Sequence, residues 1–234
     1  MLKRRLYQDL LDWKNRRASS KALFIMGARQ VGKSTLARHF GAENYESVIE
    51  INFYNDPGAS RIFRQQTAQT VLTQLTAYTG QSIIPGKTLI ILDEIQECPA
   101  ARTAVKFLVE EGSAQYIETG SLLGIQYKPV KSLPVGYEEQ INMYPMDFEE
   151  FLWALNYPLE SIQYLKDCFL HRQSVGEAVH DRMLRLFETY IVVGGMPEAV
   201  QTYVRTRDIT ETVYIQKQIL TLYRQDISKY AQGL

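Results

Sequence analysis

The sequence predicts an α/β domain built around a mostly parallel β-sheet, followed by a smaller unit made only of helices. Three observations favour this fold class. Short apolar runs alternate with segments of helical periodicity up to about residue 146. One of these runs, at 89–92, is continuously aliphatic, which is typical of a strand buried on both faces of a parallel sheet. Beyond Pro145 only helical spacing recurs.

Composition bounds the class of protein. The chain has 234 residues, and its 26 basic and 26 acidic side chains cancel, so net charge gives no sign of a nucleic-acid or membrane-surface partner. No apolar run is long enough to span a bilayer, and the N-terminus lacks the apolar block of a signal peptide. Cys98 and Cys168 are far apart and in no metal-type spacing. We expect two reduced, buried thiols and a cytoplasmic protein.

The first predicted elements are a helix, a strand, a helix and a strand. Apolar residues recur every three or four positions at the N-terminus, which predicts an amphipathic helix with a basic outer face. These residues are Leu2, Leu6, Leu10 and Trp13. The basic face could touch phosphates, although a solvated face is the usual role of such charges. The apolar run at 22–26 predicts a strand, the pattern at 33–40 a helix, and the run at 48–53 a second strand.

The next elements continue the alternation. Apolar spacing predicts a helix over 67–78, and the aliphatic run at 89–92 predicts the buried strand. Pro99 can open the following helix and Gly112 can end it. Two further strands are expected at 115–118 and 140–144.

The remainder of the chain predicts a helical lid. Three helix-start patterns recur, each with a capping residue followed three positions later by glutamate. The pairs are Asp147 with Glu150, Ser174 with Glu177, and Asp208 with Glu211. We therefore expect a core domain with its N-terminal helix at 1–146 and a helical subdomain at 147–234.

A phosphate-binding motif lies between the first strand and the next helix. GARQVGKS matches G-x-x-x-x-G-K-[ST], the P-loop or Walker A pattern, without deviation. Backbone N–H groups of the loop and the helix dipole favour a phosphate there, and Gly27 and Gly32 leave room for its approach. Lys33 can reach the β- and γ-phosphates, and the Ser34 hydroxyl can ligate Mg²⁺. The alternative is a Gly-rich turn without a ligand. The residues expected to bind nucleotide are Gly27, Ala28, Arg29, Gln30, Val31, Gly32, Lys33, Ser34 and Thr35.

An acidic pair, Asp93 and Glu94, follows the buried strand and completes a Walker B pattern. Ligands of parallel sheets bind at the carboxyl ends of the strands, so Asp93 can hold Mg²⁺ directly or through water. Glu94 can act as the general base that polarises the attacking water. Taken alone, the pair could simply cap the next helix. Beside a phosphate loop it predicts nucleotide hydrolysis.

Weaker candidates surround these residues. Thr119 or Ser121, after the strand at 115–118, could sense the γ-phosphate or the water, but a helix-capping turn is an equally good interpretation. Arg29 could meet nucleotide or a neighbouring subunit. Three further arginines could act as an arginine finger, although surface arginine is the default for each: Arg61, Arg64 and Arg102.

With these residues assembled, the chain resembles a family of bacterial and archaeal AAA-type ATP-binding proteins. Besides GARQVGKST and LIILDEIQ, the resemblance rests on ETGSLLG, PVGYEEQINMYPMDFEEFLWAL, VVGGMPEAV and RQDISKY. Members usually carry a further C-terminal, nuclease-like domain of unknown function. They continue into it at about the point where this chain stops, so the resemblance implies a domain that this sequence lacks.

The resemblance implies an ATPase core of the additional-strand class, with an extra strand between the loop strand and the acidic strand; 48–53 suits that strand. It also implies a helical lid. Gly195-Met196-Pro197 is similar to a Gly-x-Pro motif whose proline packs near adenine, which assigns that role to Pro197. The alternative is that Gly194 and Gly195 end one helix and Pro197 begins the next. The lid offers no clear sensor arginine, so hydrolysis could be slow or need a partner.

The leading functional hypothesis is a Mg²⁺-dependent ATPase that works as a switch or motor module, with ATP and Mg²⁺ as its ligands. The alternative is a nucleotide-binding regulatory module with little turnover. A small-molecule kinase is disfavoured because Glu94 directly follows Asp93 and no arginine-rich lid clamps an acceptor. Besides ATP and ADP, the partners that we consider are a second copy of the chain, a protein client and weakly bound DNA. We expect no membrane partner.

Overall fold

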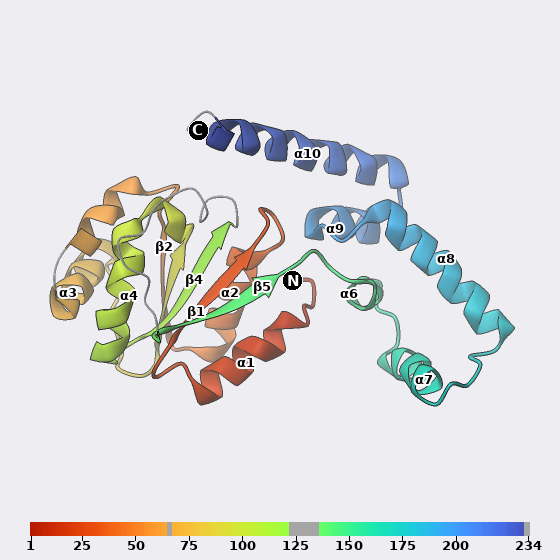
Figure 1. The fold of residues 1–234 in the computed structure, drawn as a ribbon, viewed down its shortest axis with the longest axis horizontal. Helices are drawn as coiled ribbons and strands as arrows, with labels where there is room; N and C mark the ends of the chain where they lie inside the picture. The colour runs from red at the N-terminus through yellow and green to blue at the C-terminus, as the bar shows by residue number, and fades with distance from the viewer. Residues whose placement is uncertain (65–66, 122–135, 232–234) are drawn as a thin grey trace. The chain divides into compact units, whose positions relative to one another are not determined.

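The computed structural model describes residues 1–64, 67–121 and 136–231. They fall into two compact units (Figure 1). The core unit is Leu6–Tyr144, and the helical unit combines Met1–Arg5 with Pro145–Leu234.

The core unit contains a five-stranded parallel sheet in the order β2-β3-β4-β1-β5. Its strands are β1 (Ala22–Gly27), β2 (Ser47–Asn52), β3 (Thr88–Asp93), β4 (Gln115–Ser121) and β5 (Glu138–Met143). Every residue of β3 is buried, as expected for a strand covered on both faces. The predicted α/β fold with a parallel sheet is confirmed.

The predicted identity of the additional strand is wrong. We expected 48–53 to lie between the loop strand and the acidic strand, but β2 lies at the edge of the sheet, beside β3. The inserted strand is β4, which pairs with β1 on one side and β3 on the other. Chain order misled the assignment because a parallel crossover can place a later strand between two earlier ones.

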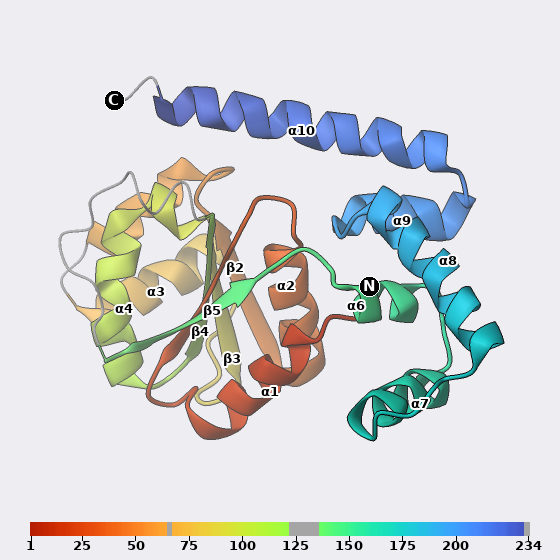
Figure 2. The ribbon, with the colours of Figure 1, turned by 45° about the vertical axis from the view of Figure 1, so that its right-hand side comes forward.

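Helices cover both faces of this sheet (Figure 2). The helical segments of the core are α1 (Leu6–Arg16), α2 (Lys33–Asn44), α3 (Ala68–Thr79) and α4 (Pro99–Glu111), with the 3₁₀ turns η1 (Pro57–Arg64) and η2 (Ile95–Glu97). On one face, α3, α4 and η1 pack in a continuous apolar cluster with strand residues such as Phe24 and Leu92. On the other face α2 contacts the strands and α1 packs against α2.

The basic side chains near the N-terminus are engaged within the protein. Lys14 donates from Nζ to the Asn44 carbonyl at 2.6 Å and lies 4.8 Å from the centre of the Tyr45 ring. The Arg17 guanidinium pairs with the Glu139 carboxylate. Lys14 and Arg17 therefore have partners within the protein, and neither is simply solvated or free to bind a phosphate.

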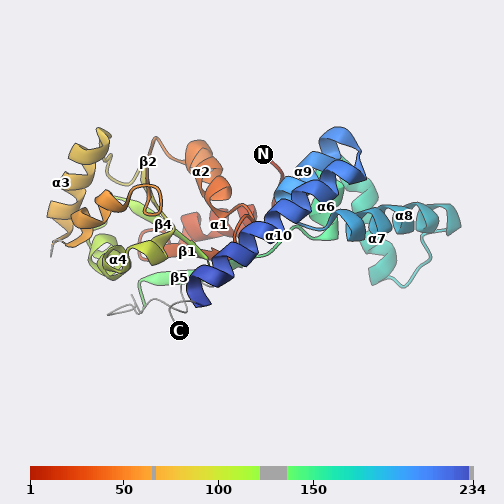
Figure 3. The same cartoon turned by 90° about the horizontal axis from the view of Figure 1, so that it is seen from above.

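The helical unit contains α6 (Phe148–Ala154), α7 (Leu159–Leu170), α8 (Glu177–Val193), α9 (Pro197–Thr206) and α10 (Ile209–Ala231). The long helix α10, dark blue in Figure 3, packs on α9 and α8. Within the described part of this unit every regular element is a helix, as predicted.

Two of the three predicted helix starts fit the observed contacts. Asp147 caps α6 in a capping box with Glu150, and Asp208 Oδ1 accepts from the Thr210 N–H at 2.6 Å. The start predicted at Ser174 is wrong, because the residue before α8 is Gly176. The Ser174 hydroxyl instead accepts the Gly176 N–H in the preceding turn, a local bond that competes with capping.

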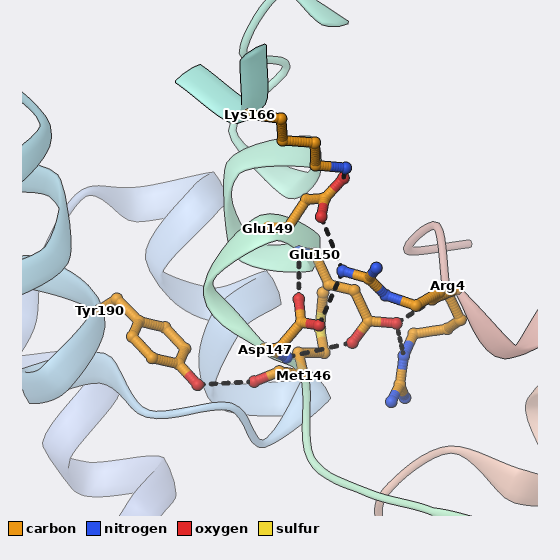
Figure 4. A network of polar contacts seen from close by, with 8 residues as sticks. Arg4, Met146, Asp147, Glu149, Glu150, Lys166 and Tyr190 are labelled. Atoms are coloured by element: carbon orange, nitrogen blue, oxygen red, sulfur yellow. Dashed lines mark hydrogen bonds and ion pairs between the residues drawn. The ribbon is translucent and has the colours of Figure 1, made fainter. Parts of the chain in front are cut away.

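The first five residues join the helical unit through a buried ion pair (Figure 4). Glu150 accepts hydrogen bonds from Arg4 Nε at 3.1 Å, the Arg5 N–H at 2.7 Å and the Asp147 N–H at 3.1 Å. The Arg4 and Glu150 side chains are each only 6% exposed. The outer Arg5 guanidinium pairs with Asp147 and Glu149.

The glycine-rich turn before α9 is fixed by a close backbone approach. The Met146 N–H donates to the Gly195 carbonyl at 2.7 Å, and a Cβ on Gly195 would lie 2.2 Å from the Met146 carbonyl oxygen. Gly194 (φ 71°) ends α8, and Pro197 occupies the first turn of α9. The turn therefore ends one helix and begins the next, as the alternative interpretation of this sequence expected. The contact of Pro197 with adenine stays a prediction.

Candidate nucleotide site

The phosphate-loop sequence connects β1 to α2 and folds around its own lysine. Lys33 is the first residue of α2, and its Nζ donates to the carbonyls of Gly27 at 3.1 Å and Ala28 at 2.8 Å. Only 5% of Lys33 is exposed. Burial lowers the pKa of Lys33, while the nearby carboxylates of Glu94 and Asp93 oppose that shift. The ammonium is held where a phosphate group would be its natural counter-charge.

The two loop glycines are needed for different reasons. Gly32 has φ 98° and precedes α2, a left-handed conformation that favours glycine. Gly27 pairs with Met143 on β5, and a Cβ there would lie 2.2 Å from the Met143 carbonyl oxygen. In this structure, therefore, close packing of β5 already requires a glycine at the start of the loop.

The carboxylate of Asp93 connects three elements at the carboxyl edge of the sheet. The Ser34 hydroxyl, at the start of α2, donates to Asp93 Oδ1 at 2.6 Å. The Thr119 hydroxyl of β4 donates to the same oxygen, and Asn52 Nδ2 of β2 donates to Oδ2 at 2.6 Å. Asp93 itself is 2% exposed. The structure thus brings together three predicted residues, Ser34, Asp93 and Thr119.

Asn52 was missed by the sequence analysis. It ends β2 directly opposite Asp93 in the register of the sheet, and its own Oδ1 accepts the N–H groups of Tyr54 and Asn55 at 3.1 and 2.8 Å. A signal was present, because a polar residue lay next to the end of the strand predicted at 48–53 and the carboxyl ends of parallel strands share one edge.

Glu94 adopts a constrained backbone conformation next to this carboxylate. Its φ is 55°, in the left-handed region that non-glycine residues rarely adopt. The Glu94 N–H donates to the Thr119 hydroxyl at 3.4 Å, and the Glu94 carboxylate accepts from Gln96 Nε2. Because η2 separates it from α4, which begins at Pro99, the acidic pair does not cap that helix.

Thr119 and Ser121 belong to a strand and form no turn. β4 extends through Ser121, and both side chains are buried. Thr119 reaches the acidic pair as described, whereas Ser121 lies beside Gly27, the first residue of the loop, in the strand register. The structure therefore places these two candidates next to different parts of the site.

The candidate arginines divide into engaged and exposed residues. Arg102 is 4% exposed, pairs with Glu138 at 3.3 Å and stacks 4.8 Å from the centre of the Phe24 ring, so it is not available to a neighbouring subunit. Arg61 and Arg64 are exposed on η1, and Arg29 is half-buried in the loop. Pro197 belongs to the helical unit, whereas the loop and the acidic residues belong to the core unit.

A buried carboxylate lies one residue before Thr119. Glu118 is fully buried, and neither of its carboxylate oxygens has a hydrogen-bond partner among the described residues. Burial raises its pKa well above the ordinary value; the Glu138 charge adds to that shift and Arg102 opposes it. Sequence patterns did not single it out.

The donor set is suitable for Mg²⁺. The hydroxyl of Ser34 and the carboxylate of Asp93 supply hard oxygen ligands that already converge to 2.6 Å. Within the described ranges no group of three or more His, Cys, Asp or Glu side chains could hold a metal. Mg²⁺ sites usually have one or two protein ligands, and substrate phosphates and water complete the coordination.

The parallel sheet, the loop around Lys33 and the carboxylate at the end of β3 define a P-loop nucleotide-binding protein. Residues 19–152 match the AAA domain family, and the chain belongs to this family. It therefore carries an ATP-binding module of the AAA type. Residues 184–233 match a second family, described as a domain of unknown function. The comparison with curated proteins gave no match.

Solved structures share the fold. The Walker-type ATPase PABY2304 of Pyrococcus abyssi is 14% identical, with a TM-score of 0.57 over 98% of this chain and 76% of that chain. Drosophila ORC bound to DNA (15% identity, TM-score 0.48, 91% and 66% coverage) and C. elegans PCH-2 (12%, 0.45, 88% and 60%) are too distant to support an argument. None of the helices described here is long and apolar enough to cross a membrane.

Proposed function

We propose that this protein is a Mg²⁺-dependent ATPase that hydrolyses ATP to ADP and phosphate. The observation that carries the proposal is the 2.6 Å contact between Ser34 Oγ and Asp93 Oδ1, beside the buried ammonium of Lys33. A hydroxyl, a carboxylate and an ammonium at the carboxyl edge of a parallel sheet suit a metal-bound polyphosphate.

Each residue has a role in the proposed reaction. Lys33 would bind the β- and γ-phosphates, and Ser34 and Asp93 would hold Mg²⁺, which would offset phosphate charge. Glu94 accepts a proton from water as the water oxygen attacks the γ-phosphorus. The bond from that phosphorus to the bridging oxygen breaks, and ADP leaves with the bonding electrons. Thr119 would sense the γ-phosphate from its place beside Asp93 and Glu94.

The test is phosphate release from Mg-ATP by the full chain, with Mg-GTP as a competitor. Glu94→Gln should lower turnover about 10²–10⁴-fold while ATP still binds, because it removes the proton acceptor and keeps the shape. Lys33→Ala should abolish binding. Glu160→Gln, on α7 in the other unit, is the matched control and should leave turnover unchanged.

The same assay distinguishes the other hypotheses. Tight ATP binding without phosphate release would reject the ATPase and favour the regulatory module. A phosphorylated acceptor in place of free phosphate would indicate a kinase. Both results would contradict the proposed general-base role of Glu94.

We further propose a switch or motor role that involves self-association. Arg61 and Arg64 are exposed and carry no ion pair within the described residues, so either could supply charge to a neighbouring subunit. Turnover per molecule should then rise with protein concentration, and replacing both arginines by glutamine should remove that rise. DNA binding should be weak and salt-sensitive at most, and a filter-binding assay that shows salt-resistant binding would contradict this. A protein client and the cytoplasmic location stay predictions.

A further inference from the structure

A glutamine beside the proposed base has no role in the mechanism given above. Gln96 lies in η2, two residues after Glu94, and is 5% exposed. Its Nε2 donates to Glu94 Oε2. The orientation of the carboxamide follows from chemistry, because an ionised carboxylate only accepts hydrogen bonds and must therefore meet the NH₂ end.

Three hydrogen bonds hold Glu94 in place. The Thr119 hydroxyl accepts its N–H at 3.4 Å, and the Glu97 N–H donates to its carbonyl at 2.9 Å. Gln96 holds the carboxylate itself. A left-handed backbone at a non-glycine residue is unfavourable and persists only where the surroundings enforce it. Gln96 fixes Glu94 Oε2, whereas no hydrogen bond to Glu94 Oε1 is found among the described residues, so Oε1 can receive a proton.

The other end of the same carboxamide is unused. Gln96 Oε1 is buried and has no hydrogen-bond partner among the described residues. A buried acceptor without a partner is costly, so such atoms need an explanation. A phosphate oxygen cannot satisfy it, since both groups are acceptors. A water molecule can, because it donates, and Oε1 belongs to the same planar amide whose Nε2 contacts the Glu94 carboxylate.

We propose that Gln96 is a water-positioning residue of the hydrolysis site. Its Nε2 orients Glu94 and its Oε1 accepts one O–H of the attacking water, whose second O–H points to Glu94. The second proton goes to Glu94 as the oxygen–phosphorus bond forms; Gln96 only orients and exchanges no proton. This inference rests on the proposed ATPase function.

The test is steady-state ATP hydrolysis by Gln96→Met, which keeps the length of the side chain and removes both polar ends. We expect kcat to fall about 10–10²-fold, the scale of losing one fixed hydrogen bond to the reacting group. KM and the Kd of a fluorescent ATP analogue should change less than about twofold, since phosphate binding is carried by other residues. Gln69→Leu, exposed on α3, is the matched control.

Coupling to Glu94 separates positioning from a merely structural role. Glu94→Gln alone and Glu94→Gln combined with Gln96→Met should turn over equally slowly, because residues that act as a unit are not additive. Wild-type kcat in Gln96→Met, or the same fold loss in the Glu94→Gln background, would overturn the inference and leave the ATPase intact. A wild-type chain that binds ATP without releasing phosphate overturns the ATPase and this inference with it. If Gln96→Met unfolds, Gln96→Asn, which withdraws the carboxamide by one methylene, provides the same test.

Discussion

The buried Glu118 should destabilise the core unit, and replacing it should stabilise the protein. Glu118 shares its surroundings with Glu138 and Arg102, so the three groups carry one negative charge in excess when all are ionised. Glu118→Met has a similar volume and leaves the Arg102–Glu138 pair neutral. Neither Glu118 oxygen has a partner to lose among the described residues.

The expected gain can be bounded. A buried polar group without a hydrogen bond costs about 1–3 kcal/mol, so Glu118→Met should raise the free energy of unfolding by about that amount at neutral pH. Because burial raises the pKa of Glu118, the folded chain keeps a proton on this carboxyl at pH values where the unfolded chain has already released it. Wild-type stability is then lost with rising pH until the folded pKa is passed, by at most about 1.4 kcal/mol per pH unit. The advantage of the variant should grow over that window.

The assay is urea unfolding across a pH series at fixed ionic strength. The chain has two tryptophans, of which Trp13 is buried in the core unit and Trp153 lies in the helical unit. In a Trp153→Phe background, fluorescence reports the core alone. Glu46→Gln, with an exposed carboxylate, is the control. A Glu118→Met variant that is less stable than wild type at high pH would refute the reasoning, because Glu118 would then make a net attraction to Arg102.

Three further predictions concern the remaining contacts. Glu150→Gln removes the charged carboxylate of the buried Arg4–Glu150 ion pair and should cost about 3–5 kcal/mol in urea unfolding followed by Trp153 fluorescence; a loss below about 1 kcal/mol would contradict a stabilising buried pair. Gly195→Ala drives a methyl group into a backbone carbonyl and should cost about 1–3 kcal/mol in thermal unfolding; an unchanged Tm would contradict this close approach. Asn52→Leu removes a hydrogen bond to Asp93, the carboxylate proposed to hold Mg²⁺, and should weaken the apparent Mg²⁺ affinity of ATP turnover about 10–100-fold; an unchanged Mg²⁺ titration would reject that role.

Sequence patterns were sufficient for the α/β class, the strand positions and the residues that carry the site motif. Each depends on local information: apolar runs mark strands, and the loop motif needs a fixed spacing from β1 to α2. The capping box at Asp147 was equally local, because its two residues lie within one turn.

The parts that were missed depend on which strands are neighbours. The insertion of β4 between β1 and β3 is set by crossover topology, which periodicity does not encode. Asn52 gains its role only from being opposite Asp93, and Glu118 is buried only because helices cover its face of the sheet. Gln96 is close to Glu94 in sequence, but the contact depends on a left-handed backbone that few residues adopt.

The ion pair that fastens the amino terminus also fixes an order of events during synthesis. Arg4 and Glu150 are 146 residues apart, so at about 5–20 residues per second the ribosome adds Glu150 about 7–30 s after Arg4. The core unit is one continuous stretch, Leu6–Tyr144, and all of it is made in that interval. Residues 1–5, which are made before the whole core unit, are therefore among the last of the described residues to find their partners. A nascent chain that halts before Glu150 can complete the core while Arg4 still lacks its carboxylate.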